Sequence, residues 1–287
     1  MTTTPPSSLQ LDDSLTNKAA APGSMRYFAL LYTPAAKRAA VMALYIIDAE
    51  IRASAQSANH DVAHTRLQWW RQEIDRLVNN NAQHPATRVL ATLPDFDRRA
   101  YAQLHELIVA ADMDLARMTY LNLRELRSYA ARSGGTVQEL IARVLTPAPL
   151  DDASRQAANR LGIAIRESEM LRDLRQDAHE GRLYLPLDEL ERAALKLEDL
   201  RAREVTPMLR KTLARFHEAI VEDFDPQSAD LTAASRAYLR PVFVLAALHR
   251  RLLERIASRG YDVATARIEL GPLQKTWVAW RAARKAG

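Results

Sequence analysis

Hydrophobic positions recur along most of this chain at the three- and four-residue spacing of an α-helix. Two runs illustrate the pattern, namely Leu104, Leu107, Ile108 and Ala111, and later Leu245, Leu248, Leu252 and Ile256. Side chains at this spacing share one helix face, which is expected to be buried against neighbouring elements. Alternating runs of β-branched and aromatic residues are missing, so strands have little support. The chain is therefore predicted to be all-α.

Proline and glycine divide the chain into helix-sized segments. No segment stands apart by composition or by a long linker, so the pattern predicts one helical domain over residues 25–287. The opening stretch, residues 1–24, is polar and rich in small residues. It has neither a basic start nor an apolar run, so we expect a disordered tail there and not a signal peptide.

Composition narrows the class of protein. The chain has 287 residues, of which 48% are hydrophobic, and this is enough for a sizeable core. It has no cysteine, which excludes disulfides and thiolate metal sites. The net charge of +5 suits phosphate-bearing ligands or an anionic membrane surface, but it is too mild to indicate nucleic acid. No apolar stretch approaches the roughly 20 residues of a membrane span. We expect a cytoplasmic protein with peripheral contact at the inner face of the membrane.

An acidic stripe is the strongest candidate for chemistry. Glu169, Asp173 and Asp177 follow one another at four-residue intervals, so on a helix their carboxylates project from one face. Such carboxylates repel each other unless a cation lies among them. The cation could be Mg²⁺ bound to a diphosphate, or the neighbouring arginines of an ordinary solvated helix face. The residues alone leave both interpretations open.

Read in order, several segments resemble the squalene/phytoene synthase family. The segment Leu171-Arg172-Asp173 through Arg182-Leu183-Tyr184-Leu185-Pro186 is the most specific, because an Asp-x-x-x-Asp pair alone is common on helices but this context is not. The other matching segments are 27–34, 40–45, 66–73, 112–115, 129–137 and 252–280. The resemblance thus covers nearly all of the chain after the tail.

The resemblance implies an isoprenoid-synthase-type helical bundle with a central cavity. In active members, two Asp-x-x-x-Asp motifs on facing helices hold Mg²⁺, which binds prenyl diphosphates and draws off diphosphate while two prenyl chains are joined head to head. Carried over, it implies catalytic roles for Asp173 and Asp177, which would bind Mg²⁺ together with Glu169. Substrate contacts are implied at Arg52, Arg166, Arg172, Arg182 and Tyr184. Salt bridges for the arginines, and a packing role with a hydrogen-bonded hydroxyl for Tyr184, are the alternatives.

The first acidic motif of the family is broken in this chain. An ungapped count from Tyr45 puts Arg52 and Gln56 at its two aspartates, and a shifted alignment puts Asp48 at the first but leaves Arg52 at the second. The four-residue spacing of Asp48 and Arg52 favours an ion pair over a shared metal. A guanidinium can bind phosphate bidentately, but it is not a Lewis acid. We therefore expect prenyl-diphosphate binding with weakened head-to-head prenyltransferase activity.

A divergent branch of the family shows a related pattern. It is typified by the mitochondrial complex I assembly factor with a phytoene synthase domain, and its members look like non-catalytic descendants. This resemblance supports an alternative function, a non-catalytic assembly or lipid-binding factor with a protein partner or an active paralogue.

The C-terminal segment combines aromatic rings with positive charge. Trp277 and Trp280 lie among Lys275, Arg281, Arg284 and Lys285. This mix suits an anionic membrane surface, and a terminal helix docked on the bundle is the alternative.

Overall fold

The structure is a computed structural model that describes residues 11–94, 97–147, 149–224 and 231–286. These ranges contain helices and no strand, which confirms the all-α prediction. The longer helices are α1 (Asp13–Ala20), α3 (Ala35–Ala55), α4 (His60–Val78), α7 (His105–Leu115), α8 (Leu123–Ala130), α9 (Thr136–Leu145), α10 (Asp152–His179), α13 (Pro207–Asp223), α15 (Arg240–Ser258) and α16 (Pro272–Lys285). The shorter ones are α2 (Met25–Leu31), α5 (Pro85–Ala91), α6 (Arg98–Tyr101), α11 (Leu187–Arg192), α12 (Leu197–Arg201) and α14 (Ala233–Tyr238).

Polar side chains fix where several helices begin. Ser24 accepts a hydrogen bond from the backbone N–H of Tyr27 at 3.1 Å, and Asn59 and Asp151 cap α4 and α10 in the same way. Thr206 caps α13, whose first residue is Pro207. Each side chain satisfies a backbone N–H that the first helical turn leaves free.

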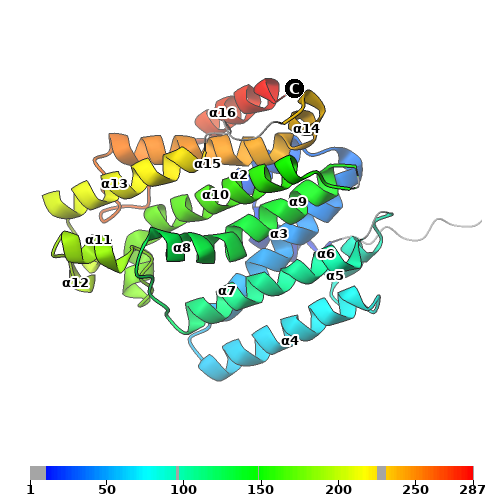
Figure 1. Cartoon of the computed structure of the whole chain (residues 1–287), viewed down its shortest axis with the longest axis horizontal. Coiled ribbons are helices and arrows are strands. Elements are labelled where there is room, and N and C mark those ends of the chain that lie inside the picture. The colour runs from blue at the N-terminus through cyan, green and yellow to red at the C-terminus, as the bar shows by residue number, and fades with distance from the viewer. Residues whose placement is uncertain (1–10, 95–96, 148, 225–230, 287) are drawn as a thin grey trace, which may run out of the picture.

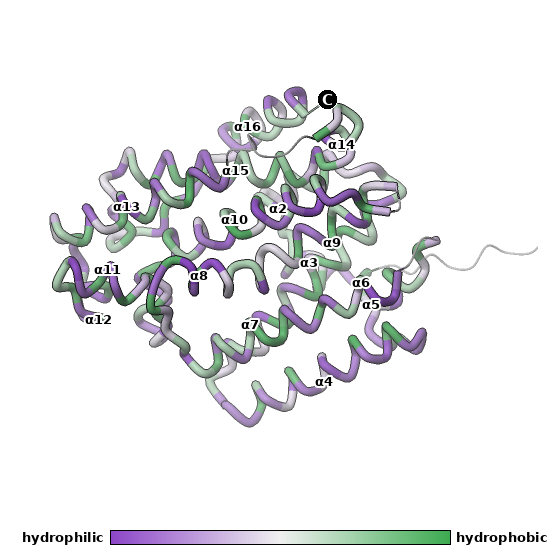
Figure 2. The backbone as a smooth tube through the Cα atoms, in the orientation of Figure 1, coloured by the Kyte–Doolittle hydropathy of each residue, from purple (hydrophilic) through white to green (hydrophobic). Residues whose placement is uncertain are grey.

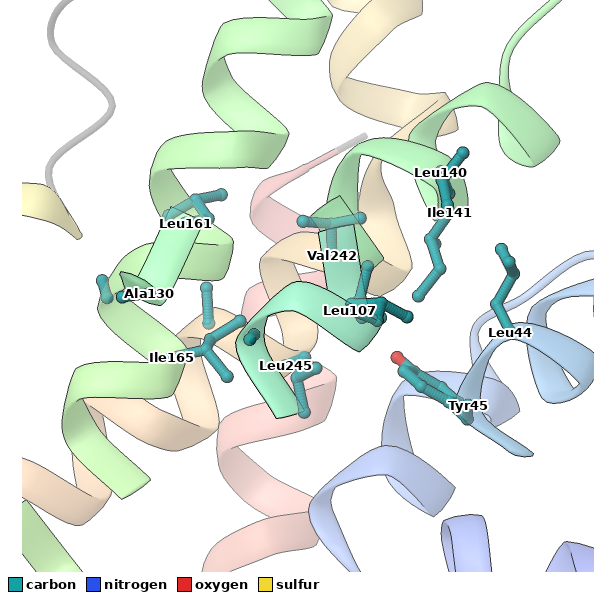
Figure 3. Packing of buried hydrophobic residues seen from close by; sticks show 14 of the residues in the cluster. Leu44, Tyr45, Leu107, Ala130, Leu140, Ile141, Leu161, Ile165, Val242 and Leu245 are labelled. Atoms are coloured by element: carbon teal, nitrogen blue, oxygen red, sulfur yellow. The ribbon is translucent and has the colours of Figure 1, made fainter. Parts of the chain in front are cut away.

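The helices pack around one hydrophobic core. Helix α10 runs through the middle of the bundle and contacts α8, α9, α13 and α15, while α4 and α16 lie at opposite edges (Figure 1). Figure 3 shows side chains of α3, α7, α9, α10 and α15 converging, among them Leu44, Tyr45, Leu140, Ile165 and Leu245. Hydrophobic and hydrophilic positions are interspersed along each helix (Figure 2), as expected for helices with one buried face. The two hydrophobic runs that predicted helices are both buried. The first lies in α7 and the 3₁₀ turn before it, and the second lies in α15.

The N-terminal expectation needs a correction. Residues 1–10 lie outside the described part of the chain, but Asp13–Ala20 forms α1 where a disordered tail was expected. Asp12 caps this helix, and Ala19 and Ala20 are buried against α3. Two adjacent alanines give little hydrophobic signal in the sequence, so this helix was missed.

A close backbone crossing holds α10 against the bundle. A π-helical turn at Ala131–Gly135 links α8 to α9, and it packs directly on α10. A Cβ atom added to Gly162 would lie 2.3 Å from the carbonyl oxygen of Gly134. Only glycine allows this approach, which brings α10 and the Ala131–Gly135 turn together next to the acidic stripe.

Within the described residues, no helix is both long and apolar enough to cross a membrane.

Candidate functional site

The acidic stripe lies on one face of α10, as its spacing predicted, but an arginine binds each carboxylate. Arg172 holds Asp173 with two hydrogen bonds, one of them from Nε to Oδ1 at 2.9 Å. Arg267 approaches the same oxygen with its Nε at 3.0 Å. Arg182 binds Asp177 from Nε and Nη2, at 3.1 and 2.9 Å. The salt-bridge alternative for Arg172 and Arg182 is therefore what the structure shows, and their contact with phosphate stays a prediction.

Glu169 is the carboxylate of the stripe that pairs with α3. Arg52 of α3 donates from Nη1 to its Oε2 at 3.1 Å, and Arg166, one turn earlier on α10, reaches the same oxygen at 3.4 Å. Burial alone would raise the pKa of Glu169, but these two guanidinium groups lower it well below its usual value. Glu169 is therefore ionised and already neutralised.

Arg52 also binds Asp48 on its own helix. Its Nε donates to Oδ1 of Asp48 at 2.8 Å, which confirms the ion pair predicted from the four-residue spacing. Asp48 is only 1% exposed and accepts a second ion pair from Arg26 of α2. Burial would raise the pKa of Asp48, but Arg52 and Arg26 lower it. Arg52 thus joins Asp48, the acid that the shifted alignment puts in the first motif, to the acidic stripe.

The carboxylates in this arrangement do not fit a Mg²⁺ site. Mg²⁺ requires near-octahedral oxygen ligands and retains several waters. In the described ranges, no group of three or more acidic or histidine side chains is placed to hold a metal. A metal at Glu169 and Asp173 would have to displace Arg52 and Arg172. Binding of Mg²⁺ at these carboxylates therefore stays a prediction.

A tyrosine network fixes Arg166. Tyr129 and Tyr184 each donate a hydroxyl hydrogen bond to Asp114, at 2.8 and 2.7 Å. Arg166 donates in turn from Nη2 to the hydroxyl of Tyr129 at 2.8 Å and to that of Tyr184 at 3.4 Å. Burial raises the pKa of Tyr129 to about 12 and that of Tyr184 further still, so both keep their protons at neutral pH. Tyr184 is buried and hydrogen-bonded, as its packing interpretation predicted.

Asp177, at the C-terminal end of the stripe, differs from Glu169 in its proton affinity. Burial raises the pKa of Asp177 to about 6, although Arg182 favours the charged form. Arg182 is its hydrogen-bond partner, and Arg166 also favours the charged form while Asp173 opposes it.

A small pocket lies where α2, α3, α9, α10 and α15 meet. Arg26, Arg52 and Arg166 line it together with Glu169, and His249 faces them from α15. Its free volume of about 10 Å³ is close to the minimum that one water needs. Burial lowers the pKa of His249 to about 4, and its Nδ1 lies 2.7 Å from the hydroxyl of Ser168, so it is neutral at pH 7. Three guanidinium groups and one carboxylate line the pocket and, with these side chains in place, nearly fill it.

Sequence reasoning missed several members of this site. Arg26 was overlooked although it directly precedes the matching segment that starts at Tyr27, and Tyr129 although it opens another. Asp114 lies in the matching segment 112–115, but its role as acceptor for the two tyrosines was not predicted. An isolated charge within an otherwise apolar helix was the only sequence signal for Arg26.

Comparison with known proteins finds phytoene synthases among the relatives of this chain. The squalene/phytoene synthase family model matches residues 19–274. Phytoene synthase 1 of Arabidopsis thaliana is 30% identical over 255 residues, which is 86% of this chain but only 59% of that protein. The phytoene synthase of Mycobacterium tuberculosis is 29% identical over 270 residues, covering 88% of this chain and 84% of that protein. The chain thus spans about three-fifths of the plant relative's length.

Solved structures share the fold at lower identity. A dehydrosqualene synthase crystallised with a ligand superposes with a TM-score of 0.82 at 16% identity, covering 95% of both chains. The squalene synthase HpnC of Alicyclobacillus acidocaldarius gives 0.70 at 22% identity, covering 87% of this chain and 92% of that one. These similarities confirm the isoprenoid-synthase-type bundle. The match over residues 19–274, together with this fold, shows that the chain belongs to the squalene/phytoene synthase family.

Proposed function

We propose that this protein binds prenyl diphosphates through guanidinium groups at the centre of the bundle and that its head-to-head prenyltransferase activity is weakened. One observation carries the proposal: Arg52, which stands at an acid position of the first motif in either alignment, pairs with Glu169. The site therefore has fixed cations where the family resemblance implies acids that bind metal.

The presence of arginines in place of metal-binding acids determines what the site can do to a diphosphate. A diphosphate leaves readily only when its developing negative charge is neutralised. Arg26, Arg52 and Arg166 supply positive charge and bidentate hydrogen-bonding geometry, so they suit binding. They do not supply the charge density of a metal ion, so ionisation of the substrate is expected to be slow.

Binding requires the central side chains to rearrange. The pocket of about 10 Å³ is far smaller than a diphosphate, so Arg52 must release Glu169 or Asp48 to reach the ligand. The diphosphate then also contacts Arg172, Arg182 and Tyr184, once these side chains have left their own partners. Glu169, Asp173 and Asp177 would be open to Mg²⁺ only after Arg52, Arg172 and Arg182 had left them.

The test separates binding from turnover. Purified protein is incubated with farnesyl or geranylgeranyl diphosphate, with and without Mg²⁺, while binding is followed by calorimetry and turnover by pyrophosphate release. We expect binding that Arg52→Ala weakens, with slow or no release of pyrophosphate. Arg155→Gln, on the exposed side of α10, is the matched control. Absence of binding to either diphosphate would refute the proposal, while rapid turnover abolished by Asp173→Ala would refute the weakened activity.

A second candidate function is a non-catalytic assembly or lipid-binding factor. The nearly filled pocket and the arginine partner of every acid in the stripe favour it, because neither feature serves ionisation of a substrate. The proposed location is the cytoplasm, with peripheral contact at the inner face of the membrane. Affinity capture of a stable protein partner, with no isoprenoid defect in a null mutant, would favour this function. An isoprenoid defect alone, without a partner, would count against it.

A further inference from the structure

A groove separate from the central pocket runs between α15 and α16. Its volume of about 630 Å³ lies within the range of small-molecule sites, roughly 300–1,000 Å³. Leu161 of α10 and Phe224, at the end of α13, also contribute to its lining. The groove therefore lies on the α16 side of the bundle, at the upper edge in Figure 1.

The floor of the groove is apolar. Phe243 and Ala246 of α15 line it together with Val278 and Ala282 of α16. Small alanine side chains on both walls leave space between the two helices. Such a floor can cover a hydrocarbon chain but offers no partner to a polar ligand.

The rim of the groove is strongly basic. Arg250 and Arg251 come from α15, and Arg281 and Lys285 from α16. Glu254 also lines the groove, but it is paired with Arg251 at 2.7 Å. Arg250, Arg281 and Lys285 are exposed, and none of them has a hydrogen-bond or ion-pair partner among the described residues. The rim therefore carries uncompensated positive charge above an apolar floor.

The outer face of α16 continues the apolar surface into solvent. Leu273, Trp277 and Trp280 lie at helical spacing on this face and are 86%, 59% and 41% exposed. The two indole rings stack with centroids 5.1 Å apart, and the guanidinium of Arg284 lies over Trp280. Exposed tryptophan beside basic residues is typical of helices that lie in a membrane interface.

From these observations we infer that the α15–α16 groove binds an anionic phospholipid of a bilayer. The headgroup phosphate pairs with Arg250, Arg281 and Lys285, and one acyl chain lies on the apolar floor. Trp277 and Trp280 lie at the headgroup level of the same bilayer. The occupant is a bilayer lipid because the unpaired cations and the exposed Trp277 line one groove and Trp280 stacks on Trp277, which a free anion would not explain. The inference deepens the membrane contact proposed above.

Vesicle flotation with the full chain tests the inference. We expect binding to vesicles of phosphatidylcholine with phosphatidylglycerol, weak binding to phosphatidylcholine alone, and loss of binding at high salt. Arg281→Glu with Lys285→Glu should weaken binding by at least roughly twenty-fivefold, since each lost basic residue costs about fivefold. Arg88→Glu, an exposed arginine on α5, is the matched control and should change little. Equal binding to both kinds of vesicle, or an equal loss in the control, would overturn the inference.

Further variants separate the groove from simple surface attraction. Arg250→Glu and the groove-filling Ala282→Phe should both reduce binding and the phosphatidylglycerol that native mass spectrometry detects on the protein. Circular dichroism verifies that each variant is folded. If both variants retain the lipid, or if soluble farnesyl diphosphate displaces it, the groove is not a phospholipid site. Arg52→Ala should leave vesicle binding unchanged, so failure of this inference is distinguishable from failure of prenyl-diphosphate binding.

Discussion

Arg52 reaches from α3 to α10 and donates a hydrogen bond from Nη1 to Oε2 of Glu169 at 3.1 Å. Because the same guanidinium also holds Asp48, one side chain bridges two carboxylates on two helices. Arg26 and Arg166 supply the further positive charge that neutralises these carboxylates. The family resemblance implies acids on facing helices that share a metal ion. Between α3 and α10 of this chain there is an ion pair instead. The charge balance of the site is thus complete without any added cation.

Changing Arg52 tests whether it takes the place of a metal. Arg52→Asp would put a second carboxylate four residues after Asp48 on α3, facing Glu169. Removing one partner from a buried ion pair destabilises a protein by about 3 kcal/mol, so the variant should unfold at lower temperature. Added Mg²⁺ should then restore part of the lost stability, because the new carboxylate cluster can bind it.

Thermal unfolding with Mg²⁺ or with a chelator measures this effect. The original protein and Arg52→Gln should show no response to Mg²⁺, because neither gains a carboxylate. A Mg²⁺ response in the original protein would contradict the assignment of Arg52 as the resident cation.

The tyrosine network should contribute measurably to stability. Tyr184→Phe removes the hydroxyl that donates to Asp114 at 2.7 Å. A hydrogen bond to a charged, part-buried acceptor contributes about 2 kcal/mol, so urea denaturation should show a loss of that size. Tyr238→Phe, at a half-exposed position on α14, is the control. Equal losses in the two variants would mean that the network does not stabilise the fold.

Glu167 should make stability fall as pH rises. It is fully buried, its carboxylate has no hydrogen-bond partner among the residues that the structure describes, and Arg127 is 3.8 Å away. Burial raises the pKa of Glu167 from 4.5 to about 8. Between these pH values the folded state holds a proton that the unfolded state has released, so the contribution is destabilising and grows with pH.

Glu167→Gln removes this titration. The variant should gain stability over the original protein from pH 5 to pH 7.5, by at most about 1.4 kcal/mol per pH unit. Urea denaturation at several pH values measures the difference, and Glu198→Gln, an exposed position on α12, should show none. A pH-independent difference would contradict the raised pKa of Glu167.

Gly162 should not tolerate a methyl group. Gly162→Ala would usually stabilise a helix by about 1 kcal/mol. Here the new Cβ would meet the carbonyl oxygen of Gly134 at 2.3 Å, so α10 must shift and we expect a loss of about 3 kcal/mol. Thermal and urea unfolding report it, with the exposed Gln156→Ala on the same helix as control. If Gly162→Ala leaves the stability unchanged or raises it, α10 and the Ala131–Gly135 turn are not in close contact.

The sequence predicted the helices because their signal is local. Leu104 and Leu107 share a face through a three-residue spacing, and such a spacing is visible without knowing what covers it. Helix α1 was missed because Ala19 and Ala20 carry little of that signal, and its stability comes from packing on α3.

The sequence by itself determined that Glu169, Asp173 and Asp177 project from one helix face and that Arg52 replaces an acid of the first motif. Only the tertiary structure decided which cation meets each carboxylate. Arg52 and Glu169 are 117 residues apart, and Arg267 and Asp173 are 94 apart. The period of a helix fixes neighbours three or four residues away, but contacts over such distances depend on how α3, α10 and the segment after α15 pack. Whether an acidic stripe is available to a metal or closed by guanidinium groups therefore follows from packing and not from spacing.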